Sequence, residues 1–198
     1  MSYAKSETLV ASALAPLDWT RSLSLAVAFS LLTAAAAQIS IPIGPVPITG
    51  STFAVLLTGA LLGSRLGALA MIIYLVEGSF GLPFFTNFGR GIQTFLGPTG
   101  GYLVAFPAAA FITGSFAEQG WDKRFLSAAA AMAIGAVVIL LAGWAWLTQL
   151  MPPAVAYRAG IEPFLIGELI KVVLAAAVLP SGWYLLERKA SSSTADRD

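Results

Sequence analysis

Two opposite charges stand three residues apart in the last long apolar segment of the chain, at Glu168 and Lys171. Pro163 suits the first turn of a helix, where its missing N–H is not needed, so Lys171 would lie roughly 12 Å along a helix that begins there. Residues three apart share one helix face. A charge at this depth in a membrane costs about 2.5–3.5 kcal/mol by insertion scales, and such residues face a cavity or a partner inside the bundle. The pair is therefore either a structural ion pair or part of a polar site for a small solute.

A carboxamide, Asn87, lies in an apolar and aromatic loop over residues 81–99 that could complete such a site. A carboxylate only accepts hydrogen bonds, an ammonium only donates them, and an amide does both. With aromatic walls, this set suits a neutral or zwitterionic solute, or an acid whose carboxylate needs a cation. The alternative for the loop is an interfacial belt, because aromatic residues also gather at membrane surfaces.

The composition removes several function classes. The chain has neither Cys nor His, which excludes disulfides and thiolate metal sites and removes the usual general base. The sequence offers no nucleophile–base pair and no metal-ligand cluster, so we expect no enzyme, no metal site and no cofactor. The formal net charge of +1 gives no reason to expect nucleic acid as a partner.

The apolar content predicts an integral protein of the lipid bilayer, with multiple passes through the cell (inner) membrane. The chain is 58% hydrophobic and 11% charged, whereas a soluble domain carries roughly 25% charged residues. Its apolar runs predict an all-α membrane protein, a six-transmembrane-helix bundle with spans at residues 22–40, 50–63, 66–80, 100–116, 125–150 and 163–186. Residues 22–187 would form the solute-binding domain, between a cytoplasmic tail over 1–21 and a disordered cytoplasmic tail over 188–198.

A proline-rich stretch over residues 41–49 separates the first two predicted spans. Pro42, Pro45 and Pro47 exclude a helix interior. Irregular backbone at membrane depth is tolerated only where protein or a water-filled cavity covers it. We therefore expect a structured cap at one membrane face.

Basic residues are distributed unevenly between the two sides of these spans. With both termini cytoplasmic, eight of the eleven basic residues fall inside and only Arg90 and Arg158 fall outside, while Lys171 lies within the membrane. This asymmetry fits the positive-inside rule. It brings the proline-rich cap, the aromatic loop and the start of the last span to the outer face, so we expect an outward-facing pocket there.

Small residues repeat at a spacing of four in the first predicted span, as Ser30 with Ala34 and Thr33 with Ala37. This spacing lets another helix approach closely. The partner could be a second membrane protein, or a helix of the same bundle, and composition does not decide between them.

Three stretches carry a family resemblance: Gln38-Ile-Ser-Ile-Pro-Ile-Gly-Pro-Val-Pro-Ile-Thr49, Gly78-Ser-Phe-Gly-Leu-Pro-Phe-Phe85 and Leu96-Gly-Pro-Thr-Gly-Gly-Tyr102. In this order and spacing they resemble the BioY family, the substrate-binding S components of energy-coupling factor (ECF) biotin transporters. The likeness covers roughly residues 23–189.

The resemblance implies a six-helix bundle that binds biotin at the extracytoplasmic side, with a membrane partner, the T component, and two ATPase subunits. It implies biotin-binding roles for Asn87, Glu168 and Lys171, although the family pattern has Asp where this chain has Glu168. It also implies that the small residues Ser30, Ala34, Thr33 and Ala37 contact the T component. The ring system of biotin would then pack on aromatic residues of the loop, from the set Phe84, Phe85, Phe88 and Phe95.

Three rival functions remain open at this point. The chain could be an S component for another vitamin, which would differ only in the pocket. It could be a stand-alone secondary transporter that uses Glu77 or Glu168 as a proton carrier. It could also be a membrane structural protein without a ligand, in which the charges are a packing pair.

Overall fold

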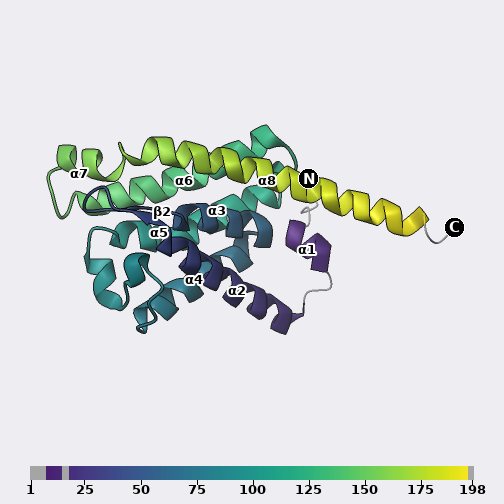
Figure 1. The fold of residues 1–198 in the computed structure, drawn as a ribbon, viewed down its shortest axis with the longest axis horizontal. Helices are drawn as coiled ribbons and strands as arrows, with labels where there is room; N and C mark the ends of the chain where they lie inside the picture. The colour runs from purple at the N-terminus through teal and green to yellow at the C-terminus, as the bar shows by residue number, and fades with distance from the viewer. Residues whose placement is uncertain (1–7, 15–17, 196–198) are drawn as a thin grey trace, which may run out of the picture.

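The chain folds as a bundle of α-helices with one β-hairpin (Figure 1). The computed structural model describes residues 8–14 and 18–195. The helices are α1 (Leu9–Leu14), α2 (Trp19–Gln38), α3 (Ser51–Leu62), α4 (Ser64–Ser79), α5 (Gly100–Ala117), α6 (Phe125–Leu147), α7 (Pro153–Gly160) and α8 (Phe164–Ala195). The strands are β1 (Ser40–Ile41) and β2 (Ile48–Thr49), and short 3-10 turns occupy η1 (Thr86–Phe88), η2 (Ile92–Leu96) and η3 (Trp121–Lys123).

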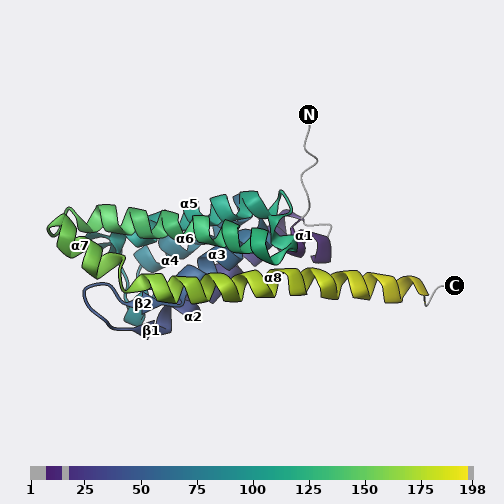
Figure 2. The ribbon, with the colours of Figure 1, turned by 90° about the horizontal axis from the view of Figure 1, so that it is seen from above.

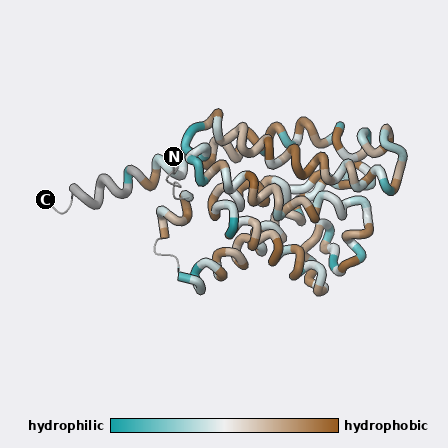
Figure 3. The backbone as a smooth tube through the Cα atoms, turned by 180° about the vertical axis from the view of Figure 1, so that it is seen from behind, coloured by the Kyte–Doolittle hydropathy of each residue, from teal (hydrophilic) through white to brown (hydrophobic). Residues whose placement is uncertain are grey.

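The predicted all-α membrane bundle is confirmed in its coarse form. Four helices, α2, α5, α6 and the apolar part of α8, are long and apolar enough to cross a bilayer, whereas α3 has 12 residues and α4 has 16. Figure 3 shows hydrophobic residues along the length of the helices and hydrophilic stretches near the turns. This is the pattern of helices that satisfy their own backbone hydrogen bonds and face lipid on one side.

Helix α5 lies at the centre of the bundle. Its apolar window is 61% buried, against 28–39% for the other three long helices, and it packs against α3, α4 and α6. Gly59 of α3 permits this approach, because a Cβ atom there would lie 2.3 Å from the backbone oxygen of Ala110 on α5. Small residues let helix backbones come this close in membranes.

The proline-rich stretch is structured, as expected, and forms a β-hairpin. Ser40 pairs with Thr49 and Ile41 with Ile48 in antiparallel register, and Val46 in the connection is buried. Its prolines prevent a helix, so the backbone pairs across the hairpin instead. The hairpin and α7 lie toward the same end of the bundle (Figure 2), which we call the cap end.

Helix α7 replaces part of an expected loop. Residues 151–162 connect the last two predicted spans, and residues 153–160 of this connection form a helix with Pro153 in its first turn. Proline is favoured at that position, because its ring fixes a helical φ and its missing N–H is not needed. The paired prolines therefore start a short helix here rather than prevent one.

The C-terminal end differs from its predicted tail, whereas the cytoplasmic location of the N-terminal tail stays a prediction. The tail predicted over 1–21 falls partly outside the described residues, but its described part includes α1, which packs against α3 and α8. The tail predicted to be disordered from residue 188 is helical through Ala195, and residues 196–198 lie outside the described part. Extending an existing helix avoids the cost of nucleation, so α8 continues past its apolar part and projects beyond the bundle (Figure 2).

At the end of the bundle opposite the cap end, a buried carboxyl group links η3 to α8 and makes the stability of the fold depend on pH. Asp122 in η3 is 2% exposed, Trp183 Nε1 donates to its Oδ2 at 2.6 Å, and its Oδ1 has no hydrogen-bond partner among the described residues. Burial raises the pKa of the Asp122 carboxyl above its usual range. The folded state therefore holds this proton more tightly than the unfolded state, and stability falls as pH rises between the two pKa values.

We expect Asp122→Asn to remove this contribution, because the amide keeps an acceptor for Trp183 and carries no charge. The melting temperature of the purified variant should rise relative to the unsubstituted chain as pH increases from 4 to 7. Each unit of pKa shift corresponds to about 1.4 kcal/mol. A melting difference that stays constant over this pH range would contradict the prediction.

Candidate functional site

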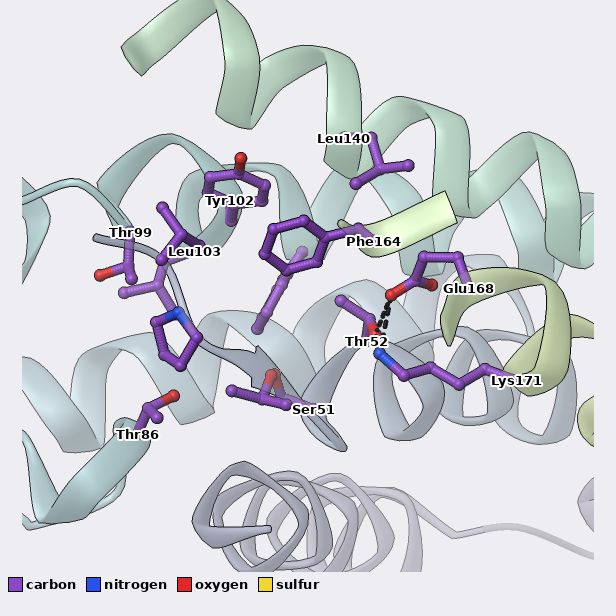
Figure 4. Close-up of a pocket in the computed structure, with 14 residues that line it drawn as sticks. Ser51, Thr52, Thr86, Thr99, Tyr102, Leu103, Leu140, Phe164, Glu168 and Lys171 are labelled. Carbon is purple, nitrogen blue, oxygen red and sulfur yellow. Dashed lines mark hydrogen bonds and ion pairs between the residues drawn. The ribbon is translucent and has the colours of Figure 1, made fainter. Parts of the chain in front are cut away.

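The predicted charge pair forms and recruits a third residue from another helix. Glu168 and Lys171 lie on one face of α8, and Lys171 Nζ donates to Glu168 Oε1 at 2.7 Å. Thr52 of α3 contacts both: its hydroxyl donates to Glu168 Oε1 at 2.9 Å and accepts from Lys171 Nζ at 2.7 Å. Figure 4 shows the three side chains converging. Two helices distant in sequence therefore hold one compact polar group.

This polar group keeps unused hydrogen-bonding capacity. Glu168 is 5% exposed, and its Oε2 has no hydrogen-bond partner among the described residues. An ionised oxygen left unpaired at depth is costly. In a purely structural ion pair this desolvation cost would remain, whereas a hydrogen-bond donor on a bound ligand would remove it.

The polar group lies in the wall of a hollow that is partly open to solvent. The cap hairpin, α3, α5, α6 and α8 all contribute to its walls. The apolar wall is made of Tyr102, Leu103, Phe106, Leu140 and Phe164. Apolar and aromatic walls with a few convergent polar groups are typical of a small-molecule site.

Two aromatic rings from different helices define the middle of this wall (Figure 4). Tyr102 of α5 and Phe164 of α8 stack with centroids 6.0 Å apart and planes at 27°. The Tyr102 hydroxyl donates to the Gly160 carbonyl at 2.7 Å, which fastens the end of α7 beside the hollow. A flat ligand could lie against these rings.

The aromatic residues predicted to hold the ligand lie elsewhere, and that interpretation is corrected. Phe84, Phe85, Phe88 and Phe95 do not line this hollow. Phe85 is buried edge-on against Tyr74 and Phe95, with both centroid distances 5.6 Å. Phe85 also lines a neighbouring hollow and Phe88 is exposed, whereas the rings in the wall of the Glu168–Lys171 hollow come from the helices.

Asn87 lies beside the polar group rather than in it. It occupies η1 with a left-handed backbone (φ 56°, ψ 40°), which Asn tolerates well, and its Oδ1 accepts a hydrogen bond from Ser40 Oγ at 2.9 Å. It lines a neighbouring hollow of about 570 Å³. The two hollows share four wall residues: Pro47, Thr86, Thr99 and Leu103. Asn87 is thus separated from Glu168 and Lys171 by a common wall.

A family model described as the BioY family matches residues 5–188. The chain belongs to the BioY family. BioY proteins named as transporters are among its relatives: a "Probable biotin transporter BioY" of Pyrococcus horikoshii is 41% identical and covers 80% of this chain and 93% of its own length. The "Biotin transporter BioY" of Thermotoga maritima is 37% identical with the same coverage.

A solved structure has the same fold as this BioY chain. The crystal structure of the S-component for biotin from an ECF-type ABC transporter superposes with a TM-score of 0.72 and 25% identity, over 82% of this chain and 90% of that one. The family and the apolar helices together make the chain a multi-pass protein of the cell membrane.

The small-residue stripe of the BioY chain faces the bundle interior, which corrects its interpretation as a surface for another protein. Ser30, Thr33, Ala34 and Ala37 are all at most 5% exposed. Ser30 Oγ donates to Glu77 Oε2 at 2.8 Å, and Thr33 Oγ1 lies 3.9 Å from Met71 Sδ, so the stripe contacts α4. The alternative, packing within the bundle, is the one that the structure supports. Glu77 therefore contacts α2 through Ser30, and it does not line the hollow that contains Glu168.

Sequence reasoning missed Thr52, Tyr102 and Phe164 in the BioY pocket. Each is an ordinary residue type, and it reaches the polar group only because α3, α5 and α8, which are distant in sequence, all begin at the cap end. A signal existed for Thr52, because it directly follows the predicted cap. The residues that begin the next helix after a cap at the outer face necessarily lie near that face.

Proposed function

We propose that this BioY chain binds biotin in the Glu168–Lys171 pocket at the extracytoplasmic side and mediates its uptake as the S component of an energy-coupling factor transporter. One observation carries the proposal: a buried carboxylate oxygen, Glu168 Oε2, has no partner among the described residues and belongs to a residue that lines a hollow with apolar walls. The names of the relatives and of the structural neighbour support biotin as the ligand.

The chemistry of biotin suits this pocket. Its ureido ring carries N–H donors beside a carbonyl, which match the free Glu168 oxygen and the Lys171 ammonium. Its sulfur-containing bicyclic body would lie against Tyr102, Phe106 and Phe164. Asn87 would join the site from the neighbouring hollow as the outer loops close over the ligand.

The proposed orientation places the cap end outside the cell and both termini in the cytoplasm, with six spans that include the short helices α3 and α4. The distribution of basic residues supports this arrangement. Helices α3 and α4 would span by local thinning of the bilayer or by half-buried ends. Residues 1–21 would then lie on the cytoplasmic side, and residues 22–187 would form the biotin-binding domain.

Energy for transport would come from partners: a T component in the membrane and two ATPase subunits. The sequence contains no phosphate-binding loop of the Gly-Lys-Ser/Thr type, so this chain would not hydrolyse a nucleotide itself. As an S component it would be a binding protein and not an enzyme.

Uptake of labelled biotin into cells that express the chain with and without its T component and ATPase subunits tests this role. We expect uptake with the complete set to exceed the background strongly and to resist a protonophore for as long as ATP is maintained. Equal uptake by the chain alone that a protonophore abolishes would support a secondary transporter instead. Uptake of a different vitamin in place of biotin would contradict the assigned ligand.

A further inference from the structure

Thr52 stands where α3 cannot use its hydroxyl internally. A Thr hydroxyl inside a helix commonly bonds the carbonyl four residues earlier, as Thr58 does with Ala54 O at 2.6 Å. Thr52 is the second residue of α3, and four residues before it the chain is in β2. Its hydroxyl is therefore available to reach across to α8, where it contacts Glu168 and Lys171.

The three contacts form a closed triangle in which each group has a defined part. The Thr52 hydroxyl has one hydrogen, which it donates to Glu168 Oε1, and its oxygen accepts from Lys171 Nζ. Lys171 also donates to the same Glu168 oxygen. Only a hydroxyl can be donor and acceptor in this way at one atom.

Counting donors and acceptors shows what the triangle leaves for a ligand. Glu168 Oε1 accepts two hydrogen bonds, whereas Oε2 accepts none among the described residues. Lys171 uses two of its three N–H groups. One acceptor on Glu168 and one donor on Lys171 therefore remain, the complement that the adjacent N–H and C=O of an amide or a cyclic urea require.

The backbone that carries Thr52 is held from both sides. The preceding residues belong to the cap hairpin, where Gly50 N donates to Ile39 O at 2.9 Å. Further along α3, Gly59 packs directly on the backbone of α5. A rigid support lets a single hydroxyl fix the orientation of a carboxylate on another helix.

We propose that Thr52 is a positioning residue that orients the Glu168 carboxylate, so that the pocket recognises a ligand by its adjacent N–H and C=O groups. The inference rests on the proposed biotin function, since the ureido edge of biotin is such a group. Thr52 acts through Glu168 and Lys171, and biotin need not touch it.

Titration of labelled biotin into the purified full-length chain in detergent tests this role with three variants. Thr52→Val keeps the shape of the side chain and removes both hydrogen bonds. We expect its dissociation constant for biotin to rise about 10- to 100-fold, the range for hydrogen bonds that involve charged groups. Thr52→Ser keeps the hydroxyl and should stay within about 3-fold of the unsubstituted chain, by the same reasoning.

Thr58→Val is the matched control, because it makes the same change six residues further along α3, away from the pocket. It should leave biotin affinity unchanged. A biotin analogue methylated on its ureido nitrogens adds a readout that a general loss of packing would not produce. Thr52→Val should weaken biotin much more than it weakens this analogue, which lacks the N–H that Oε2 would accept.

The outcomes separate this inference from the function on which it rests. Biotin binding by the unsubstituted chain with unchanged affinity in Thr52→Val would overturn the positioning role and leave the biotin function intact. Equal losses in Thr52→Val and Thr52→Ser, or equal losses for biotin and its methylated analogue, would also overturn it. Failure of the unsubstituted chain to bind biotin would overturn both.

Discussion

Replacement of Lys171 by alanine is expected to abolish biotin binding. The substitution removes the cation that lies 2.7 Å from Glu168 Oε1 and leaves a carboxylate that is 5% exposed without its charged partner. A ligand would lose its hydrogen bond to a charged donor, which is worth about 1.5–3 kcal/mol or roughly 10- to 150-fold in affinity. The unpaired carboxylate would in addition destabilise the folded pocket. Titration of labelled biotin into the purified variant measures this loss.

Lys123→Ala is a suitable control for the removal of a lysine. Lys123 lies in η3, far from the pocket in the fold, with its Nζ 4.5 Å from the centroid of the Trp183 ring. Biotin affinity should not change in this variant. Unchanged affinity in Lys171→Ala would show that the Glu168–Lys171 pair is structural and would remove both residues from the binding site.

Replacement of Gly59 by valine is expected to destabilise the whole bundle. A Cβ atom at this position would lie 2.3 Å from Ala110 O and 2.9 Å from Ala110 Cα. Both atoms belong to the backbone of the central helix α5, so no side-chain rotation can relieve the contact. Overpacking in a core costs about 1–3 kcal/mol and occasionally more, and we expect the upper end, with a drop in melting temperature on the order of 10 °C.

Gly44→Val provides the comparison for Gly59→Val, because nothing lies within 4 Å of a Cβ atom at Gly44 in the cap hairpin. Thermal unfolding of both variants in the same detergent gives the two melting temperatures. Similar melting temperatures for the two variants would show that α3 and α5 do not approach as closely as the structure indicates.

The sequence was sufficient to predict most helix boundaries and the charged centre of the site. Apolar runs bounded by Gly and Pro marked α3, α5 and α6 to within a few residues. The three-residue spacing of Glu168 and Lys171 follows directly from helix geometry, and the ion pair forms as expected. These features depend on local sequence, so a single chain contains enough information to predict them.

The features that sequence reasoning missed depend on contacts between distant segments. The small-residue stripe of α2 is equally consistent with an outer or an inner partner, and only the position of α4 shows that the partner is internal. Thr52 lies 116 residues from Glu168 in the chain. Asn87 is a polar residue in the aromatic loop and was therefore predicted to contact the ligand. Its Oδ1 instead accepts a hydrogen bond from Ser40, and the residue lines the neighbouring hollow.

The most direct test of the central claim is equilibrium binding of labelled biotin to the purified full-length chain, with unlabelled vitamins as competitors. We predict saturable binding of one biotin per chain that unlabelled biotin displaces and that thiamine and riboflavin leave unchanged. No saturable binding by the folded protein, or displacement of biotin by the other vitamins at equal concentrations, would contradict the assignment of the Glu168–Lys171 pocket to biotin.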